Sequence, residues 1–158
     1  MKPFPGPQLL PALTAERAAL LNFVALLERE QGMLVENLTD RLPELSEQKS
    51  ADALALNELA EARRALLHGH LPQLGIDEIY AWLGTHSPQC LAVWRETLAL
   101  AERAKRLNQA NGELVQMKLR RNQQLLAVLS NAANRANLYG PDGQASFSPG
   151  SGRSLGSG

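Results

Sequence analysis

The chain contains no proline between Pro88 and Pro141, and this long gap sets the strongest limit on its architecture. Leucine and alanine, which favour helices, account for 30 and 22 of the 158 residues, whereas aromatic residues make up only 4 %. Ser87 followed by Pro88 is typical of a helix start. We therefore predict one helix from Pro88 to about Ala136, roughly 49 residues and about 73 Å long.

Two shorter helices are predicted before it. In the first, leucine recurs every seven residues, at Leu13, Leu20, Leu27 and Leu34. This spacing predicts one apolar stripe on a helix that begins near Thr14, a residue type that caps helices well. Residues 1–8 are rich in proline and glycine and are expected to be extended.

The second helix is predicted from Pro43 to His68, because proline is tolerated in the first turn of a helix. The short connection at residues 39–42 favours antiparallel packing of the first two helices. Residues 68–75 contain two glycines and a proline and predict a loop. A short helix is expected at residues 77–83, with Tyr80 and Trp82 as an aromatic patch.

The fold class is therefore predicted as all-α: a three-helix antiparallel, coiled-coil-like bundle with a short extra helix and a long C-terminal helix. Two helices of about 37 Å cannot cover the whole of a helix twice as long, so part of that helix is expected to stay uncovered. The rival arrangement is a reversal at Asn111–Gly112 that makes a four-helix bundle. We expect residues 1–145 to form a single helical domain and residues 146–158 a flexible Ser/Gly-rich tail.

Composition excludes several classes of function. Lys plus Arg equals Asp plus Glu at 16 each, so the net charge indicates neither nucleic acid nor membrane as a partner. No signal peptide is recognisable, and a soluble, cytoplasmic protein is expected, with Cys90 as a buried apolar side chain. His68 and His70 lack the further ligands of a metal site. No catalytic constellation or phosphate loop is present, so we expect no enzyme, cofactor or metal.

A polar block, residues 108–112, interrupts the predicted long helix with Asn108, Asn111 and Gly112. Such a block is explained by a tolerated kink, by asparagines that fix the register between helices, or by a site where a partner helix approaches closely. Apolar residues continue beyond it, at Leu125 and Val128 and, as candidate binding residues, at Leu114, Val115, Leu119, Leu126 and Leu129. Uncovered, they form an association surface, for which self-dimerisation is as good an explanation as a partner protein. The basic cluster at residues 118–121 is interpreted as a solvated face.

Several of these features together resemble the FlgN family of bacterial flagellar export chaperones. The resemblance covers about residues 10–146 and rests on the leucine-rich first helix, on Lys49 and Arg63-Arg64 in the second helix, and on three C-terminal segments. These segments are Asn108-Gln109-Ala110-Asn111-Gly112-Glu113-Leu114, Arg121-Asn122-Gln123-Gln124 and Leu138-Tyr139-Gly140-Pro141-Asp142-Gly143-Gln144.

The resemblance implies a cytoplasmic chaperone that binds the C-terminal helices of hook-filament junction proteins and delivers them to the flagellar type III export gate. It places substrate recognition on Asn108, Asn111, Gly112, Asn122, Gln123 and Gln124, to which the apolar residues above are added. It places docking at the export gate on Tyr139, which from the residues alone would be read only as a lone aromatic residue that covers a helix end. The alternative is a structural coiled-coil protein that pairs with its own copy and has no secretion substrate.

Overall fold

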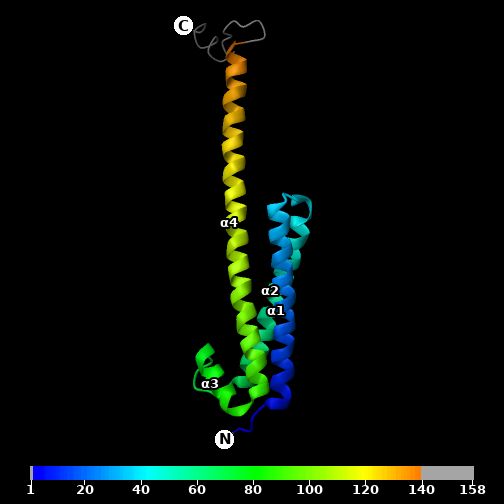
Figure 1. Cartoon of the computed structure of the whole chain (residues 1–158), viewed down its shortest axis with the longest axis vertical. Helices are drawn as coiled ribbons and strands as arrows, with labels where there is room; N and C mark the ends of the chain where they lie inside the picture. The colour runs from blue at the N-terminus through cyan, green and yellow to red at the C-terminus, as the bar shows by residue number, and fades with distance from the viewer. Residues whose placement is uncertain (1, 140–158) are drawn as a thin grey trace, which may run out of the picture. The chain divides into compact units, whose positions relative to one another are not determined.

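The computed structural model describes residues 2–139, of which Leu138 and Tyr139 are described by their backbone alone (Figure 1). These residues form helices and contain no β-strand beyond one isolated bridge between His68 and Leu71. In chain order the elements are α1 (Gly6–Val35), the 3-10 helix η1 (Thr39–Arg41), α2 (Leu42–Leu67), α3 (Ile76–His86) and α4 (Pro88–Tyr139). The predicted all-α class is confirmed.

The chain divides into two compact units: unit 1 is Met1–Leu114 and unit 2 is Val115–Gly158. Unit 1 contains α1, α2, α3 and the first part of α4, and unit 2 contains the rest of α4. The predicted tail at residues 146–158 lies outside the described residues.

The first helix begins at Gly6, eight residues before the predicted start at Thr14, so residues 6–8 are not extended as expected. Thr14 is not an N-cap, because its Oγ1 donates to the Leu10 carbonyl oxygen at 2.8 Å inside the helix. Pro11 lacks the N–H that would bond one turn back, and this loss normally costs a helix stability. Leu9 and Leu13 are completely buried, and their burial outweighs that cost.

The connection between α1 and α2 is short, as predicted, but it covers residues 36–41 and so begins three residues before the predicted 39–42. Asn37 adopts a φ of +58°, a left-handed conformation that asparagine tolerates better than most residues. Pro43 lies in the first turn of α2, where a missing N–H breaks no bond. The two helices run antiparallel, side by side (Figure 1).

The larger apolar core of unit 1 lies where α3 meets the start of α1, the end of α2 and the start of α4. It consists of Leu9, Leu13, Leu67, Ile79, Leu83, Cys90, Val93 and Trp94. Cys90 is buried among apolar side chains, as the sequence indicated. Trp82 lies at its edge, 5.3 Å from the ring of Phe4 and 4.7 Å from that of His86, centroid to centroid. Trp82 thus packs the N-terminal segment onto α3, whereas Tyr80, the other residue of the predicted aromatic patch, accepts a hydrogen bond from Arg95 Nε of α4 at 2.8 Å.

The second core of unit 1 joins α1 to the following turns of α4. It is formed by Leu20, Val24, Leu27 and Ala104, with Leu56, Leu100 and Leu107 packed against it. The heptad leucines of the first helix therefore point inward, as predicted. Exposed ion pairs lie beside this core, such as Arg17 with Glu96 at 2.7 Å.

The fourth helix begins where Ser87-Pro88 predicted: the Ser87 Oγ accepts a hydrogen bond from the Cys90 backbone N–H at 3.2 Å. Residues 108–112 are helical, so the rival reversal at Asn111–Gly112 is wrong. The helix continues to Tyr139, the last described residue, and so extends at least three residues beyond the predicted Ala136.

One helix of the described chain, α1, is long and apolar enough by length and composition to cross a membrane. Its most apolar stretch of 18 residues is 33 % buried inside the fold. Core helices of soluble proteins share this composition, and the stripe through Leu13, Leu20 and Leu27 belongs to the two cores described above.

Candidate partner-binding surface

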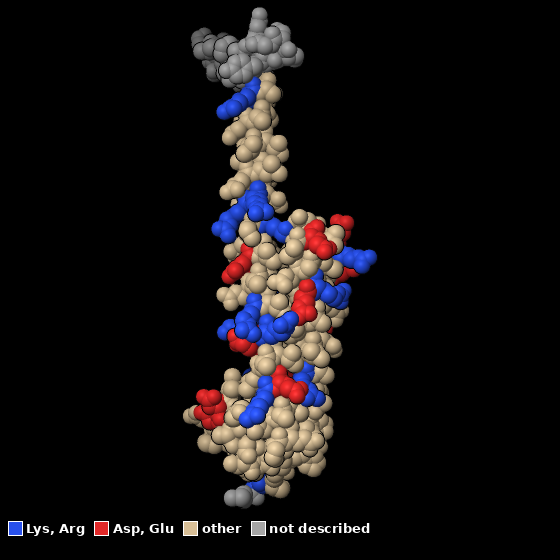
Figure 2. Space-filling view, viewed as in Figure 1, with Lys and Arg blue, Asp and Glu red and all other residues tan. Residues whose placement is uncertain are grey.

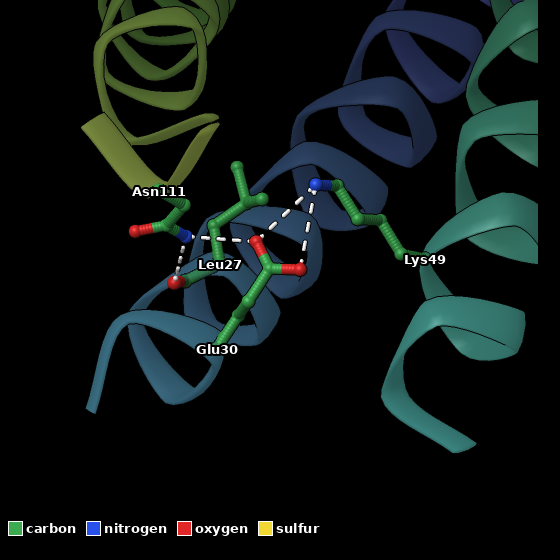
Figure 3. A network of polar contacts seen from close by, with 4 residues as sticks. All are labelled: Leu27, Glu30, Lys49 and Asn111. Atoms are coloured by element: carbon green, nitrogen blue, oxygen red, sulfur yellow. Dashed lines mark hydrogen bonds and ion pairs between the residues drawn. The ribbon is translucent and has the colours of Figure 1, made fainter. Parts of the chain in front are cut away.

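Asn111 belongs to a network of polar contacts that links three helices of unit 1 (Figure 3). Its Nδ2 donates to the Leu27 carbonyl oxygen of α1 at 2.9 Å and to Glu30 Oε1 at 2.8 Å. Lys49 of α2 contacts the same carboxylate, with its Nζ 3.2 Å from Oε1. Asn111 is only 2 % exposed, so a partner protein has no access to its amide. Its expected role in substrate binding is therefore corrected: in this structure Asn111 fixes the register of α4 against α1.

The other residues of the polar block behave differently. Asn108 is exposed, and Leu114 is half-buried. Gly112 is exposed, and a Cβ built on it has no neighbour within 4 Å. The close helix approach expected at Gly112 is thus not made by any described part of this chain.

Unit 2 presents a row of exposed apolar side chains. Val115, Leu119, Leu126 and Leu129 are 50 %, 56 %, 65 % and 55 % exposed. With Asn122 they are spaced by four, three, four and three residues, the spacing that places side chains on one line of a coiled-coil helix. We call these five residues the apolar seam.

The apolar seam has the make-up of one half of a coiled-coil interface. Unit 2 contains a single described helix and has no second described element on which to bury these side chains. A lone asparagine in such a seam, here Asn122, is a device that selects one alignment of paired helices. Exposed apolar surfaces of this kind are typical of sites at which proteins associate.

The two glutamines expected in the binding site, Gln123 and Gln124, lie on different sides of this helix. Each residue advances by about 100°, so Gln123 flanks the apolar seam, whereas Gln124 lies about half a turn from Asn122 on the opposite side. Both are exposed. One partner helix on the seam can reach Gln123 but not Gln124.

Tyr139 is the last described residue of α4. Its side chain lies outside the described residues, so its expected role at the export gate stays a prediction.

Sequence reasoning missed one polar cluster inside unit 1. Glu16 of α1 and Arg63 of α2 form a buried ion pair, and the Arg63 Cζ lies 4.9 Å from the ring centroid of Trp94. Within the described residues, Glu16 Oε2, Arg63 Nε and Trp94 Nε1 are buried without a hydrogen-bond partner. The available signal was the position of Glu16, three residues after Leu13 and four before Leu20, which places it in the apolar stripe of α1.

Comparisons with known proteins confirm the resemblance to the FlgN family. Residues 6–146 match the family model described as FlgN protein. A curated relative, the flagella synthesis protein FlgN of Proteus mirabilis, is 31 % identical over 150 residues, which cover 94 % of this chain and 97 % of the relative. No solved structure matches the chain. The match spans α1 to the end of α4, and the chain therefore belongs to the FlgN family.

Proposed function

We propose that this protein is a cytoplasmic export chaperone for flagellar hook-filament junction proteins. It binds their C-terminal helices, prevents these helices from associating early, and delivers them to the type III export gate. The observation that carries the proposal is the apolar seam of unit 2, which is exposed along its whole length. Membership of the FlgN family and the similarity to a flagella synthesis protein support the flagellar context.

The proposed mechanism is helix substitution. A junction protein's amphipathic terminal helix lays its apolar stripe on Val115, Leu119, Leu126 and Leu129, as it would on its eventual neighbour in the assembled filament. Burying one leucine side chain contributes about 1.5–3 kcal/mol, so a seam of this size is sufficient for a specific but reversible complex. The process requires no chemical step and no cofactor.

The test replaces one side chain in the seam and one just outside it. We expect Leu126→Asp to weaken binding of a purified junction protein at least about tenfold, because a carboxylate would be buried against leucines. Ala127→Asp introduces the same charge one residue later, on an exposed position that points away from the seam, and is expected to bind normally. Both variants should keep parental helicity by circular dichroism.

If Leu126→Asp binds the junction protein as tightly as the parent chain does, the junction protein binds at a site other than the apolar seam. Loss of helicity in Leu126→Asp alone would mean that Leu126 is a core residue.

Self-pairing through the apolar seam is the competing function, and the charges of unit 2 argue against it. Between Val115 and Tyr139 the chain has four basic residues and no acidic one. Two copies paired through this segment would bring like charges together. Light scattering decides: a stable dimer that ignores junction proteins would favour the structural alternative.

We further propose that Tyr139 docks the loaded chaperone at the export gate. This proposal rests on the family resemblance and on the position of Tyr139 in the chain, ten residues after Leu129 of the apolar seam. Tyr139→Ala is expected to bind junction proteins like the parent and to reduce their export in a motility assay. Weakened binding of junction proteins by this variant would instead assign Tyr139 to the substrate surface.

A further inference from the structure

The two units differ in charge, although the chain as a whole is neutral. Residues 1–114 contain 15 acidic and 11 basic side chains, whereas residues 115–139 contain four basic and none that is acidic. In the space-filling view of Figure 2, the described end of α4 shows blue side chains and no red ones. The candidate binding helix is therefore a cationic segment, and its partner experiences this charge directly.

The basic residues are not spread evenly around the helix. Spacings of three and four residues align them with exposed apolar side chains in a second line, formed by Lys118, Arg121, Leu125, Val128, Ala132 and Arg135. We call this line the basic stripe. It lies next to the apolar seam, so seam and stripe together make one broad face. Arg120 lies about 100° around the helix from Arg121, outside this broad face, and serves as an internal control.

A partner that covers this broad face must supply a counter-charge or hydrogen-bond acceptors for its arginines. Leu125 and Val128 are 57 % and 63 % exposed, and a helix that buries them also dehydrates Arg121, which lies one turn before Leu125. Among the described residues, neither Arg121 nor Arg135 has an ion-pair partner. A buried guanidinium without a counter-charge is strongly unfavourable, whereas a carboxylate placed bidentately against it restores its hydrogen bonds.

We propose, on the basis of the proposed function, that unit 2 selects client helices bearing Asp or Glu beside their leucines, the carboxylates meeting Arg121 and Arg135. These two arginines are separated by 14 residues, or about 21 Å along a helix. The client helix therefore carries its acidic residues on one flank of its apolar stripe, about two heptads apart. The seam supplies burial, and the stripe discriminates among helices that share the leucine pattern.

An amphipathic acidic helix fits this face better than nucleic acid or a membrane. Proteins that bind single-stranded nucleic acid interleave aromatic residues with basic ones, and residues 115–137 contain no aromatic residue. Helices that lie on membranes carry Trp, Phe or Leu opposite a basic face, whereas here Arg121 lies within the apolar face itself.

The test uses three designed helical peptides of three heptads with identical leucines and with Glu, Gln or Lys at the flanking positions. Each is titrated by fluorescence anisotropy into the full chain. We expect the Glu peptide to bind about tenfold more tightly than the Gln peptide, an advantage that shrinks at high salt, and the Lys peptide to bind most weakly.

The matched variants are Arg121→Glu and Arg120→Glu, which change the net charge equally, the first inside the broad face and the second outside it. Arg121→Glu should remove the preference for Glu over Gln and improve binding of the Lys peptide. Arg120→Glu should leave the preference in place. An equal effect of the two variants, or equal affinity for the Glu and Gln peptides, would overturn the proposal.

Vesicles with 30 % phosphatidylserine and a 20-nucleotide polyuridine are titrated in parallel. If the vesicles or the polyuridine bind more tightly than the Glu peptide, and if Arg121→Glu loses that binding, the ligand of this face is a membrane or a nucleic acid and not an acidic helix. Purified junction proteins separate this inference from the proposed function. If junction proteins require Leu126 but not Arg121 for binding, the charge preference is wrong and the proposed function stands. If the chain binds the Glu peptide but no junction protein, the proposed function is wrong and the charge preference stands.

Discussion

Replacing Asn111 by alanine tests whether this residue stabilises the fold of unit 1. The substitution removes a hydrogen bond to the Leu27 carbonyl oxygen, contributing about 1 kcal/mol, and one to the charged Glu30, contributing about 1.5–3 kcal/mol. It also removes the buried Asn111 Oδ1, which has no partner among the described residues and costs the folded state about 1 kcal/mol. Lys49 still pairs with Glu30 after the change. The net loss is about 2 kcal/mol.

Urea denaturation followed by circular dichroism measures this loss, and thermal denaturation should show the midpoint falling by about 4–8 °C for a chain of this size. Asn108→Ala is the matched control, because Asn108 is exposed, lies one turn earlier on α4, and shares any gain in helix propensity. We expect Asn108→Ala to change stability by no more than about 0.5 kcal/mol. If the two variants unfold at the same urea concentration, the register function inferred for Asn111 is wrong.

Four further variants probe unit 1 by chemical denaturation. Glu16→Ala should destabilise the folded chain by about 3–5 kcal/mol, because it leaves Arg63 buried without its partner. Glu16→Met combined with Arg63→Met should restore most of that lost stability. If the double variant shows no recovery, the ion pair itself stabilises the fold. Leu27→Ala should cost about 2–5 kcal/mol, since the side chain is fully buried between α1 and α4, and a smaller change would indicate a loosely packed core. Gly112→Ala should raise stability by about 0.5–1 kcal/mol, because the position is helical, exposed and open around a built Cβ; a decrease would reveal a contact that the structure lacks.

The helices themselves were predictable from the sequence because their signals are local. Pro43 and Ser87-Pro88 mark helix starts through the missing proline N–H and a capping hydroxyl, and both starts were located within one residue. The first helix was the exception. Its prolines argued for an extended segment, but the burial of Leu9 and Leu13 against distant residues decided in favour of helix.

The candidate surface was only partly predictable. The spacing of Val115, Leu119, Leu126 and Leu129 identified an apolar line, but a leucine pattern is the same for a core and for a docking face. The division of the chain after Leu114 is a tertiary property. The contrast in charge can be counted in the sequence, but only this boundary shows which residues to count together.

The sequence by itself determined an all-helical chain, its heptad stripes and its family, because helix propensity, capping and hydrophobic period act over a few neighbouring residues. Only the tertiary structure decided the use of each polar side chain. Asn111 and Asn122 are the same residue type on the same helix, yet one is buried against Leu27 and Glu30 and the other is exposed. This difference depends on residues more than 80 positions away along the chain, which no local pattern reports.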